Sequence, residues 1–211
     1  MPLPDIIYNG PENTPLTIAL AHGAGAPMDS TFMQTFAERL ADKGFRIVRF
    51  EFPYMNDRRL TGSKKPPNRA PILLETWNAV IDHLGPANLV IGGKSMGGRI
   101  ASMVAAEREQ DGIPPKGVIC LGYPFHPPGK PEKLRTEHLQ SLITPTLICQ
   151  GTRDSLGTRD EAESYPLAKT IRFHWLEDGD HGFKPRKKSG LTEDENWNSA
   201  INAMAGFCKS L

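Results

Sequence analysis

The stretch GGKSMGG at residues 92–98 follows directly on the apolar run 88–92 and precedes a helical pattern. Gly93 and Gly97 frame Ser95 in the pattern G-x-S-x-G. A serine on a tight turn between a strand and a helix has a strained backbone, and side chains two residues before and after it would collide with their neighbours. The helix that follows directs its N-terminal amides at the same point. The stretch therefore predicts an exposed, reactive serine at the carboxyl end of a buried strand.

Two phosphate-binding motifs resemble parts of the chain but fail on their spacing. Gly93-Lys94-Ser95 resembles the end of a P-loop, which requires glycine at a position where the chain has Asn88. The residues between these positions also have the pattern of a strand, where a P-loop has a loop. Gly23-Ala24-Gly25 resembles the start of a dinucleotide fingerprint, but Pro27 interrupts it and Met28 stands in place of its third glycine. Neither stretch predicts a nucleotide site.

Short apolar runs alternate with longer amphipathic runs along the whole chain. We expect strands at 16–21, 45–50, 88–92, 117–122, 145–149 and 170–176, helices at 30–43, 71–84, 96–109 and 192–209, and a linker at 58–69. This alternation predicts an α/β fold: a mostly parallel sheet of about six or seven strands with helices on both faces. We expect one domain over residues 1–211. Active residues of such folds gather at the carboxyl ends of the strands.

Composition excludes several other classes of protein. The chain has 211 residues, and its 25 basic and 24 acidic side chains give a net charge of +1, so nothing favours a nucleic-acid partner. No apolar stretch approaches the length of a membrane span, and the N-terminus lacks the pattern of a signal peptide. Two of the three cysteines lie inside apolar runs, as buried reduced thiols do. We therefore expect a cytoplasmic protein that binds neither nucleic acid nor membrane. The sequence carries no signal for an oligomeric state.

A serine nucleophile needs a base, and the base needs an acid that orients it. Asp154 follows the expected strand at 145–149, and His181 follows the expected strand at 170–176. Asp178 and Asp180 lie too close to His181 in the chain to come from a separate strand, and His174 lies within one. The sequence therefore predicts a catalytic triad of Ser95, Asp154 and His181.

An oxyanion hole requires two backbone N–H donors beside the serine. The loop after the first expected strand reads HGAGAP at residues 22–27, and its small residues allow the backbone to approach a substrate closely. We assign the N–H groups of Met96 and Ala24 as the donors, with Gly23 as the alternative to Ala24. His22 is expected to brace this loop. The histidines show no metal-ligand spacing, so no metal or organic cofactor is predicted.

Four motifs together resemble those of the α/β-hydrolase superfamily: HGAGA at 22–26, GGKSMGGR at 92–99, GTRD at 151–154 and GDHGF at 179–183. Their combination is similar to the small dienelactone-hydrolase-like group and, more closely, to predicted hydrolases related to testis-expressed protein 30 and NSL-complex subunit 3. The resemblance covers the chain from about residue 16. It implies the α/β-hydrolase fold and the chain order serine, acid, histidine. Dienelactone hydrolase uses a cysteine nucleophile where this chain has Ser95, so the resemblance does not extend to dienelactone turnover.

The segment 123–144 is too short for the cap domain that lipases insert at this position, and it contains four prolines. A cap-less site favours a small soluble ester or thioester, so we expect a carboxylesterase-like or thioesterase-like serine hydrolase. The alternative is a hydrolase-fold protein-interaction module, because relatives in this group include proteins regarded as scaffolds.

Basic residues gather in two segments that follow strands, 58–69 and 184–188. Lys64 and Lys187 represent these segments, and Lys94 lies within the serine turn itself. We expect these three lysines to contact substrate, which would favour anionic substrates. The alternative is a solvated basic surface without a catalytic role.

Overall fold

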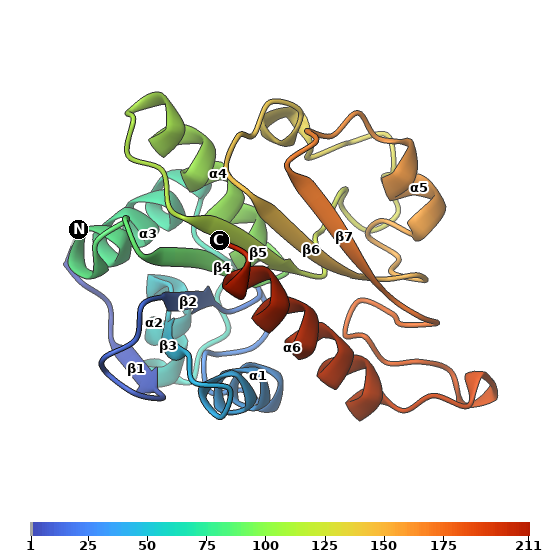
Figure 1. The fold of residues 1–211 in the computed structure, drawn as a ribbon, viewed down its shortest axis with the longest axis horizontal. Helices are drawn as coiled ribbons and strands as arrows, with labels where there is room; N and C mark the ends of the chain where they lie inside the picture. The colour runs from blue at the N-terminus through green and yellow to red at the C-terminus, as the bar shows by residue number, and fades with distance from the viewer. Residues whose placement is uncertain (1) are drawn as a thin grey trace.

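The computed structural model describes residues 2–211, in which seven strands form one sheet in the order β1-β3-β2-β4-β5-β6-β7 (Figure 1). The strands are β1 (Ile6–Asn9), β2 (Thr17–Ala21), β3 (Arg46–Phe50), β4 (Leu89–Lys94), β5 (Gly117–Leu121), β6 (Thr146–Gly151) and β7 (Ile171–Leu176). Strands β2 to β7 pair in parallel, whereas β1 pairs with β3 in antiparallel fashion at one edge. The prediction of a mostly parallel sheet is confirmed.

Helices cover both faces of the sheet. They are α1 (Thr31–Ala41), α2 (Pro53–Thr61), α3 (Ala70–Leu84), α4 (Met96–Gln110), α5 (Arg159–Ser164) and α6 (Glu193–Lys209), with short 3-10 helices η1 (Glu137–Leu139) and η2 (Lys187–Ser189). Buried residues of α1 and α6 belong to one apolar cluster, and those of α2, α3, α4 and α5 belong to a second. In Figure 1, α6 crosses in front of the sheet.

The central strands are buried on both sides because these two clusters lie on opposite faces. All five residues of β5 are buried. Val118 and Cys120 contact the cluster of α3 and α4, whereas Ile119 and Leu121 contact the cluster of α1 and α6. Successive side chains of a strand point to opposite faces, so a strand covered on both sides reads as an unbroken apolar run.

Helix α6 begins where its capping residues predict. The Thr192 hydroxyl accepts a hydrogen bond from the Glu195 N–H at 3.2 Å, and the Glu195 carboxylate accepts one from the Thr192 N–H at 2.7 Å. This reciprocal pair satisfies two N–H groups that a helix start leaves without partners. An ion pair between Arg39 and Asp194 joins the first turn of α6 to α1.

Strand β1 and helices α2 and α5 were not predicted, and the linker expected at 58–69 was partly wrong. Strand β1 and helix α5 are only four and six residues long, too short to show a period. Residues 58–61 of the expected linker belong to α2, where Pro53 begins the helix and Tyr54 and Met55 are buried. The rest of α2, from Asn56 to Arg59, is polar, so the periodic apolar pattern that predicts a helix is missing from this segment.

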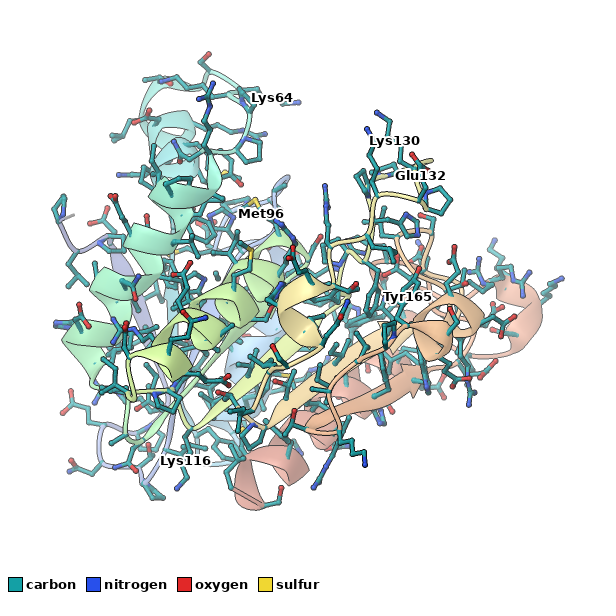
Figure 2. All side chains as sticks on the ribbon, turned by 90° about the horizontal axis from the view of Figure 1, so that it is seen from above. Lys64, Met96, Lys116, Lys130, Glu132 and Tyr165 are labelled. Atoms are coloured by element: carbon teal, nitrogen blue, oxygen red, sulfur yellow. The ribbon has the colours of Figure 1, made fainter. Side chains whose placement is uncertain are left out.

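The carboxyl ends of β4, β6 and β7 lie at the same edge of the sheet because these strands are parallel. The connection from β5 to β6 consists of loops and η1, with no cap domain in this part of the described chain. Figure 2 shows Met96 between two projecting segments, one carrying Lys64 and the other carrying Lys130 and Glu132. The edge between these segments is where the candidate site lies.

Candidate active site

Ser95 occupies the tight turn between β4 and α4. Its backbone has φ 51° and ψ −114°, a strained conformation that residues other than glycine rarely adopt. The Ser95 N–H donates to the Leu121 carbonyl at 2.9 Å. A Cβ atom at Gly93 or Gly97 would lie 2.1 or 2.4 Å from the Ala21 carbonyl oxygen, so both positions require glycine. The close passage of β2 against this turn is the physical reason for the G-x-S-x-G pattern.

The three residues predicted as a triad lie together in one hydrogen-bonded chain. Ser95 Oγ lies 2.8 Å from His181 Nε2, and His181 Nδ1 lies 2.7 Å from Asp154 Oδ2. Because the carboxylate can only accept, Nδ1 carries the proton and Nε2 is left to accept from the serine hydroxyl. This geometry is the one in which an imidazole withdraws a proton from a serine.

Gln150 holds the Asp154 carboxylate in place and was missed by sequence reasoning. Its fully buried side-chain amide donates to Asp154 Oδ2 at 2.9 Å and to the carbonyls of Tyr123 and Gly157 at 3.2 and 3.0 Å. The Leu156 N–H donates to Asp154 Oδ1 at 2.9 Å. No signal in the sequence marked Gln150, because it follows the strand expected at 145–149; in the structure β6 extends to Gly151 and buries it, and a buried polar group needs such partners.

The predicted oxyanion donors lie beside Ser95. Ala24 and Met96 line one cavity together with Ser95. Within residues 2–211, neither the Ala24 N–H nor the Met96 N–H donates to a protein acceptor. Met96 is the first residue of α4, so its N–H belongs to the group that a helix start leaves open for an anion. Both amides are therefore free to bind a substrate oxygen.

The loop 22–28 is held from beneath by the segment that follows β3. The Phe52 N–H donates to His22 Nε2 at 3.1 Å, and His22 Nδ1 therefore donates to the Gly23 carbonyl at 2.7 Å. Burial lowers the pKa of His22, which favours this neutral form. The Tyr54 hydroxyl lies 3.0 Å from the Ala24 carbonyl and donates to it. Since these carbonyls are fixed, the Ala24 N–H is fixed too.

Two cavities meet at Ser95. One, of about 350 Å³, extends along α4 and also contains Met96 and Leu156. The other, of about 490 Å³, contains His181 and the apolar side chains of Phe32 and Trp197. A substrate carbonyl at Ser95 would have one of its substituents in each cavity.

Residues 14–209 match the model of a family described as alpha/beta hydrolase domain. The chain belongs to this family. The match spans the serine turn and the turns that carry Asp154 and His181. Family membership explains why these turns lie at one edge of the sheet.

Solved structures of similar fold include three hydrolase-type proteins. An alpha-beta serine hydrolase homologue from Coxiella burnetii is 19% identical, with a TM-score of 0.69 over 94% of this chain and 90% of that chain. The monoacylglycerol lipase of Paleococcus ferrophilus is 14% identical, with a TM-score of 0.71 over 97% and 99%. A dienelactone hydrolase from Anabaena variabilis is 19% identical, with a TM-score of 0.70 over 96% and 89%. At such low identities, these likenesses concern the fold.

Lys94 of this alpha/beta hydrolase family member contacts the histidine turn. Its ammonium donates to the His181 carbonyl and lies 5.3 and 5.5 Å from the ring centres of Phe183 and Phe32. Burial lowers the pKa of Lys94 to about 8. The side chain lines the cavity that contains His181, but its charge is directed at the protein backbone. A contact with substrate stays a prediction.

Lys64 and Lys187 do not line either cavity at Ser95. Both side chains are exposed, and Figure 2 shows Lys64 at the tip of its projecting segment, away from Met96. Several cations of the same two segments have acidic partners: Lys65 pairs with Asp57, Arg59 with Asp29 and Glu51, and Arg186 with Asp178. Three of the nine cations in these two segments are therefore paired with acidic side chains.

The thiols offer no competing nucleophile. Cys120, Cys149 and Cys208 are free and buried. Burial raises the pKa of both Cys149 and Cys208 to about 12, which keeps them protonated at neutral pH. Among residues 2–211, no three His, Cys, Asp or Glu side chains are grouped to hold a metal, and no helix is long and apolar enough to cross a bilayer.

A second serine–histidine pair lies behind the site. Ser102 Oγ lies 2.8 Å from His138 Nε2, the same distance that joins Ser95 to His181. Ser102 is fully buried on α4, and its hydroxyl donates to the Arg99 carbonyl at 2.8 Å. The hydroxyl proton is therefore directed away from the imidazole, which donates to Ser102 Oγ. This pair joins η1 to α4 and cannot activate a serine.

The buried position of His138 predicts a loss of stability in acid. Burial, aided by the charge of Arg99, lowers the pKa of His138 from 6.5 to about 4. The unfolded chain therefore binds a proton at a pH where the folded chain does not, so the free energy of unfolding falls as pH drops from 6.5 towards 4. We expect this residue to contribute about 2 kcal/mol of the fall between pH 7 and pH 5 in urea unfolding. The H138Q variant should lose that part of the slope. His83→Gln, at an exposed histidine, is the control, and an unchanged slope in H138Q would contradict the assignment.

Proposed function

We propose that the protein is a serine hydrolase that cleaves a small ester or thioester through an acyl-enzyme intermediate. The observation that carries the proposal is the hydrogen-bonded chain from Ser95 Oγ through His181 to Asp154, with distances of 2.8 and 2.7 Å. It begins at a serine whose strained backbone keeps the hydroxyl exposed at the turn. Membership of the alpha/beta hydrolase family supports hydrolysis as the general reaction.

In the proposed reaction, Ser95 Oγ attacks the substrate carbonyl while His181 Nε2 takes the hydroxyl proton. Asp154 holds the ring in the required tautomer and stabilises the imidazolium. The oxyanion accepts hydrogen bonds from the N–H groups of Ala24 and Met96, each worth about 2.7–4 kcal/mol in the transition state. His181 then gives its proton to the leaving oxygen or sulfur, and the bond to the carbonyl carbon breaks. Water attacks the acyl-Ser95 by the same steps and releases the acid.

The cavities favour small substrates. The cavity of about 350 Å³ along α4 is at the small end for ligand sites, and no cap covers it within the described chain. The buried, free state of Cys120, Cys149 and Cys208 supports a reducing compartment such as the cytoplasm. The small, uncapped cavity supports a short acyl group on a soluble alcohol or thiol.

Acyl-chain length should therefore set the rate for short chains only. We expect kcat/KM for p-nitrophenyl esters to rise up to about four carbons and then to stay level up to about sixteen, because each methylene buried in the cavity contributes about 0.8 kcal/mol and each methylene outside it contributes nothing. A series of acyl chains, each assayed below its critical micelle concentration, measures this. A rate that rises steadily with chain length would contradict the proposed substrate size.

Covalent labelling separates catalysis from an interaction role. A fluorophosphonate reacts with a serine only when a base activates it, so intact mass should increase by one phosphonyl group. Digestion should place that group on the peptide that contains Ser95. An unlabelled, folded protein would favour the hydrolase-fold interaction module instead.

A further inference from the structure

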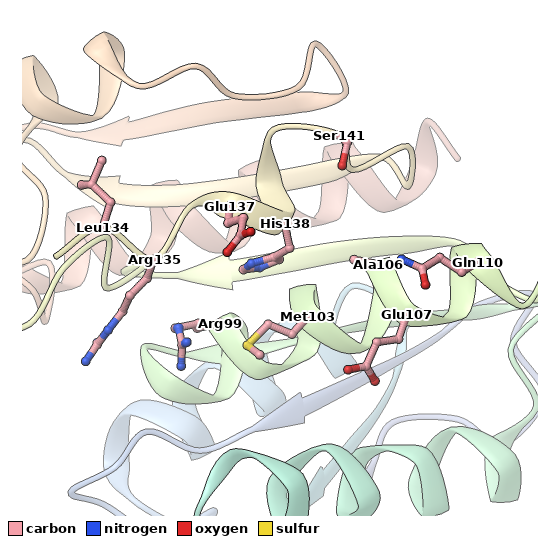
Figure 3. A pocket seen from close by; sticks show the side chains of 10 residues that line it. All are labelled: Arg99, Met103, Ala106, Glu107, Gln110, Leu134, Arg135, Glu137, His138 and Ser141. Carbon is pink, nitrogen blue, oxygen red and sulfur yellow. The ribbon is translucent and has the colours of Figure 1, made fainter.

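Two arginines line the cavity that extends from Ser95 along α4. Arg99 lies one helical turn after Ser95, and Arg135 lies in the connection from β5 to β6. Both line the cavity of about 350 Å³ that contains Ser95 and Met96. Figure 3 shows their guanidinium groups at the same end of an adjoining pocket, which the two arginines also line. Two positive charges therefore stand beside the serine.

Neither guanidinium group has a protein partner in residues 2–211. No hydrogen bond or ion pair joins either side chain to an acceptor, and the Arg99 Nε is buried and unsatisfied. None of the described residues that line the cavity is acidic. Burial and the charge of Arg99 lower the pKa of Arg135, as expected for two cations that face one another. An anion between them would supply the missing hydrogen bonds and remove this repulsion.

The backbone of both arginines is held by contacts with buried elements of the fold. The Arg135 N–H donates to the Phe125 carbonyl at 2.8 Å, and the Arg135 carbonyl accepts from the Tyr123 hydroxyl at 2.7 Å. Tyr123 and Phe125 are fully buried, so the backbone that carries Arg135 is anchored in the core. Arg99 belongs to the first turns of α4, whose start is fixed by Ser95. The backbone that carries each charge is thus held at a defined position relative to the serine.

The position of His181 decides which part of a substrate meets the arginines. His181 must deliver a proton to the leaving group, so the leaving group lies on its side of Ser95. His181 lines the apolar cavity with Phe32 and Trp197 and does not line the cavity of the arginines. The leaving alcohol or thiol therefore occupies the apolar cavity, and the acyl group occupies the basic one.

We propose that Arg99 and Arg135 bind a carboxylate on the acyl group, so that the preferred substrate is a monoester or monothioester of a short dicarboxylic acid. This proposal rests on the hydrolase function proposed above. A guanidinium group pairs with a carboxylate through two parallel hydrogen bonds, which an ammonium group cannot form. The cavity of about 350 Å³ that holds both arginines and Ser95 has room only for a short acyl chain, and glutaric acid provides the test length.

A pair of isosteric substrates tests the site. Monobenzyl glutarate carries a terminal carboxylate, and the benzyl ester of glutaramic acid carries a neutral amide of the same shape. We expect kcat/KM to favour the carboxylate by at least about tenfold in the wild-type protein. In R99M and in R135M this preference should fall at least about threefold, and in the double variant R99M/R135M it should fall to about one. Neither arginine has a protein partner, so both variants should keep the wild-type Tm.

A control variant and a binding measurement show whether the preference depends on the two arginines. Lys130→Met removes an exposed cation from the same connection as Arg135 and should leave the preference unchanged. In the S95A variant, calorimetry should show that monobenzyl glutarate binds at least about tenfold more tightly than in S95A/R99M. Equal cleavage of the two esters, or a preference lost in Lys64→Met or Lys187→Met but kept in R99M, overturns the carboxylate site and leaves the hydrolase proposal standing. Cleavage of neither ester by a protein that a fluorophosphonate labels at Ser95 overturns the substrate class alone, whereas a folded protein that is neither labelled nor active on any ester overturns the hydrolase proposal.

Discussion

The Ser95→Ala variant should lose about 10⁶-fold in kcat for a small ester and should no longer be labelled by a fluorophosphonate. The reason is that Ser95 Oγ is the atom within 2.8 Å of His181 Nε2 at the turn where both free amides converge. Without it, the amides and cavities still bind substrate, but no acyl-enzyme forms. The measurement is the initial rate of p-nitrophenyl ester hydrolysis, together with the intact mass after labelling.

Ser102→Ala is the matched control for this variant. It removes a hydroxyl that also lies 2.8 Å from a histidine Nε2, on α4, the helix that follows directly on Ser95. Its hydroxyl proton is already donated to a helix carbonyl, so we expect labelling and hydrolysis within about threefold of wild type. If S95A retained its labelling and S102A lost it, the assignment of the nucleophile would be wrong.

The serine turn could be predicted because its requirements are local. The pattern at 92–98 needs only a buried strand, two glycines and a helix start, all of which lie within one stretch of sequence. The positions of Asp154 and His181 followed from the parallel sheet, which sends the end of every such strand to one edge. The hydrogen bonds among these three side chains agree with that geometry.

The surroundings of the triad could not be predicted in the same way. Gln150 acts through contacts with Tyr123 and Gly157, and Arg99 faces Arg135 across the cavity; these partners are up to 36 residues apart in the chain. Sequence patterns show a side chain's neighbours along one element but not the element that lies opposite. Gln150 directly follows the strand expected at 145–149, where a polar residue is ordinary, so nothing in the sequence marked it.

The basic segments 58–69 and 184–188 show that the sequence also does not reveal which charged side chains have partners. The sequence has no acidic residue within 58–69, which suggested an unbalanced positive surface near the site. In the structure, Arg59 pairs with Asp29 and Glu51. Arg99 and Arg135 lack acidic partners among residues 2–211 and line the cavity at Ser95, yet no local excess of charge distinguishes them. Net charge over a segment therefore did not identify which charges are available to a ligand.

Asp154→Asn should lower kcat by about 10⁴-fold with little effect on the fold. The carboxylate accepts from His181, from the Gln150 amide and from the Leu156 N–H. An asparagine cannot accept at both oxygen positions. If its NH₂ faces His181, the imidazole must accept at Nδ1, and its Nε2 then carries the proton and cannot act as a base. If its NH₂ faces the Leu156 N–H instead, that backbone donor loses its acceptor. In the first arrangement the NH₂ opposes the Gln150 amide, which keeps the carbonyls of Tyr123 and Gly157 as acceptors, so this arrangement costs less and the basic tautomer is lost.

Asp180→Asn separates this effect from a disturbance of the histidine turn. Asp180 precedes His181 and accepts from the N–H groups of Gly182 and Lys184 through one oxygen, Oδ1. An asparagine keeps that acceptor, so D180N should stay within about threefold of wild-type kcat. Circular dichroism and Tm would show whether D154N is folded. A folded D154N enzyme with a wild-type kcat would mean that the tautomer of His181 is set by another group, and that Asp154 has only a structural role.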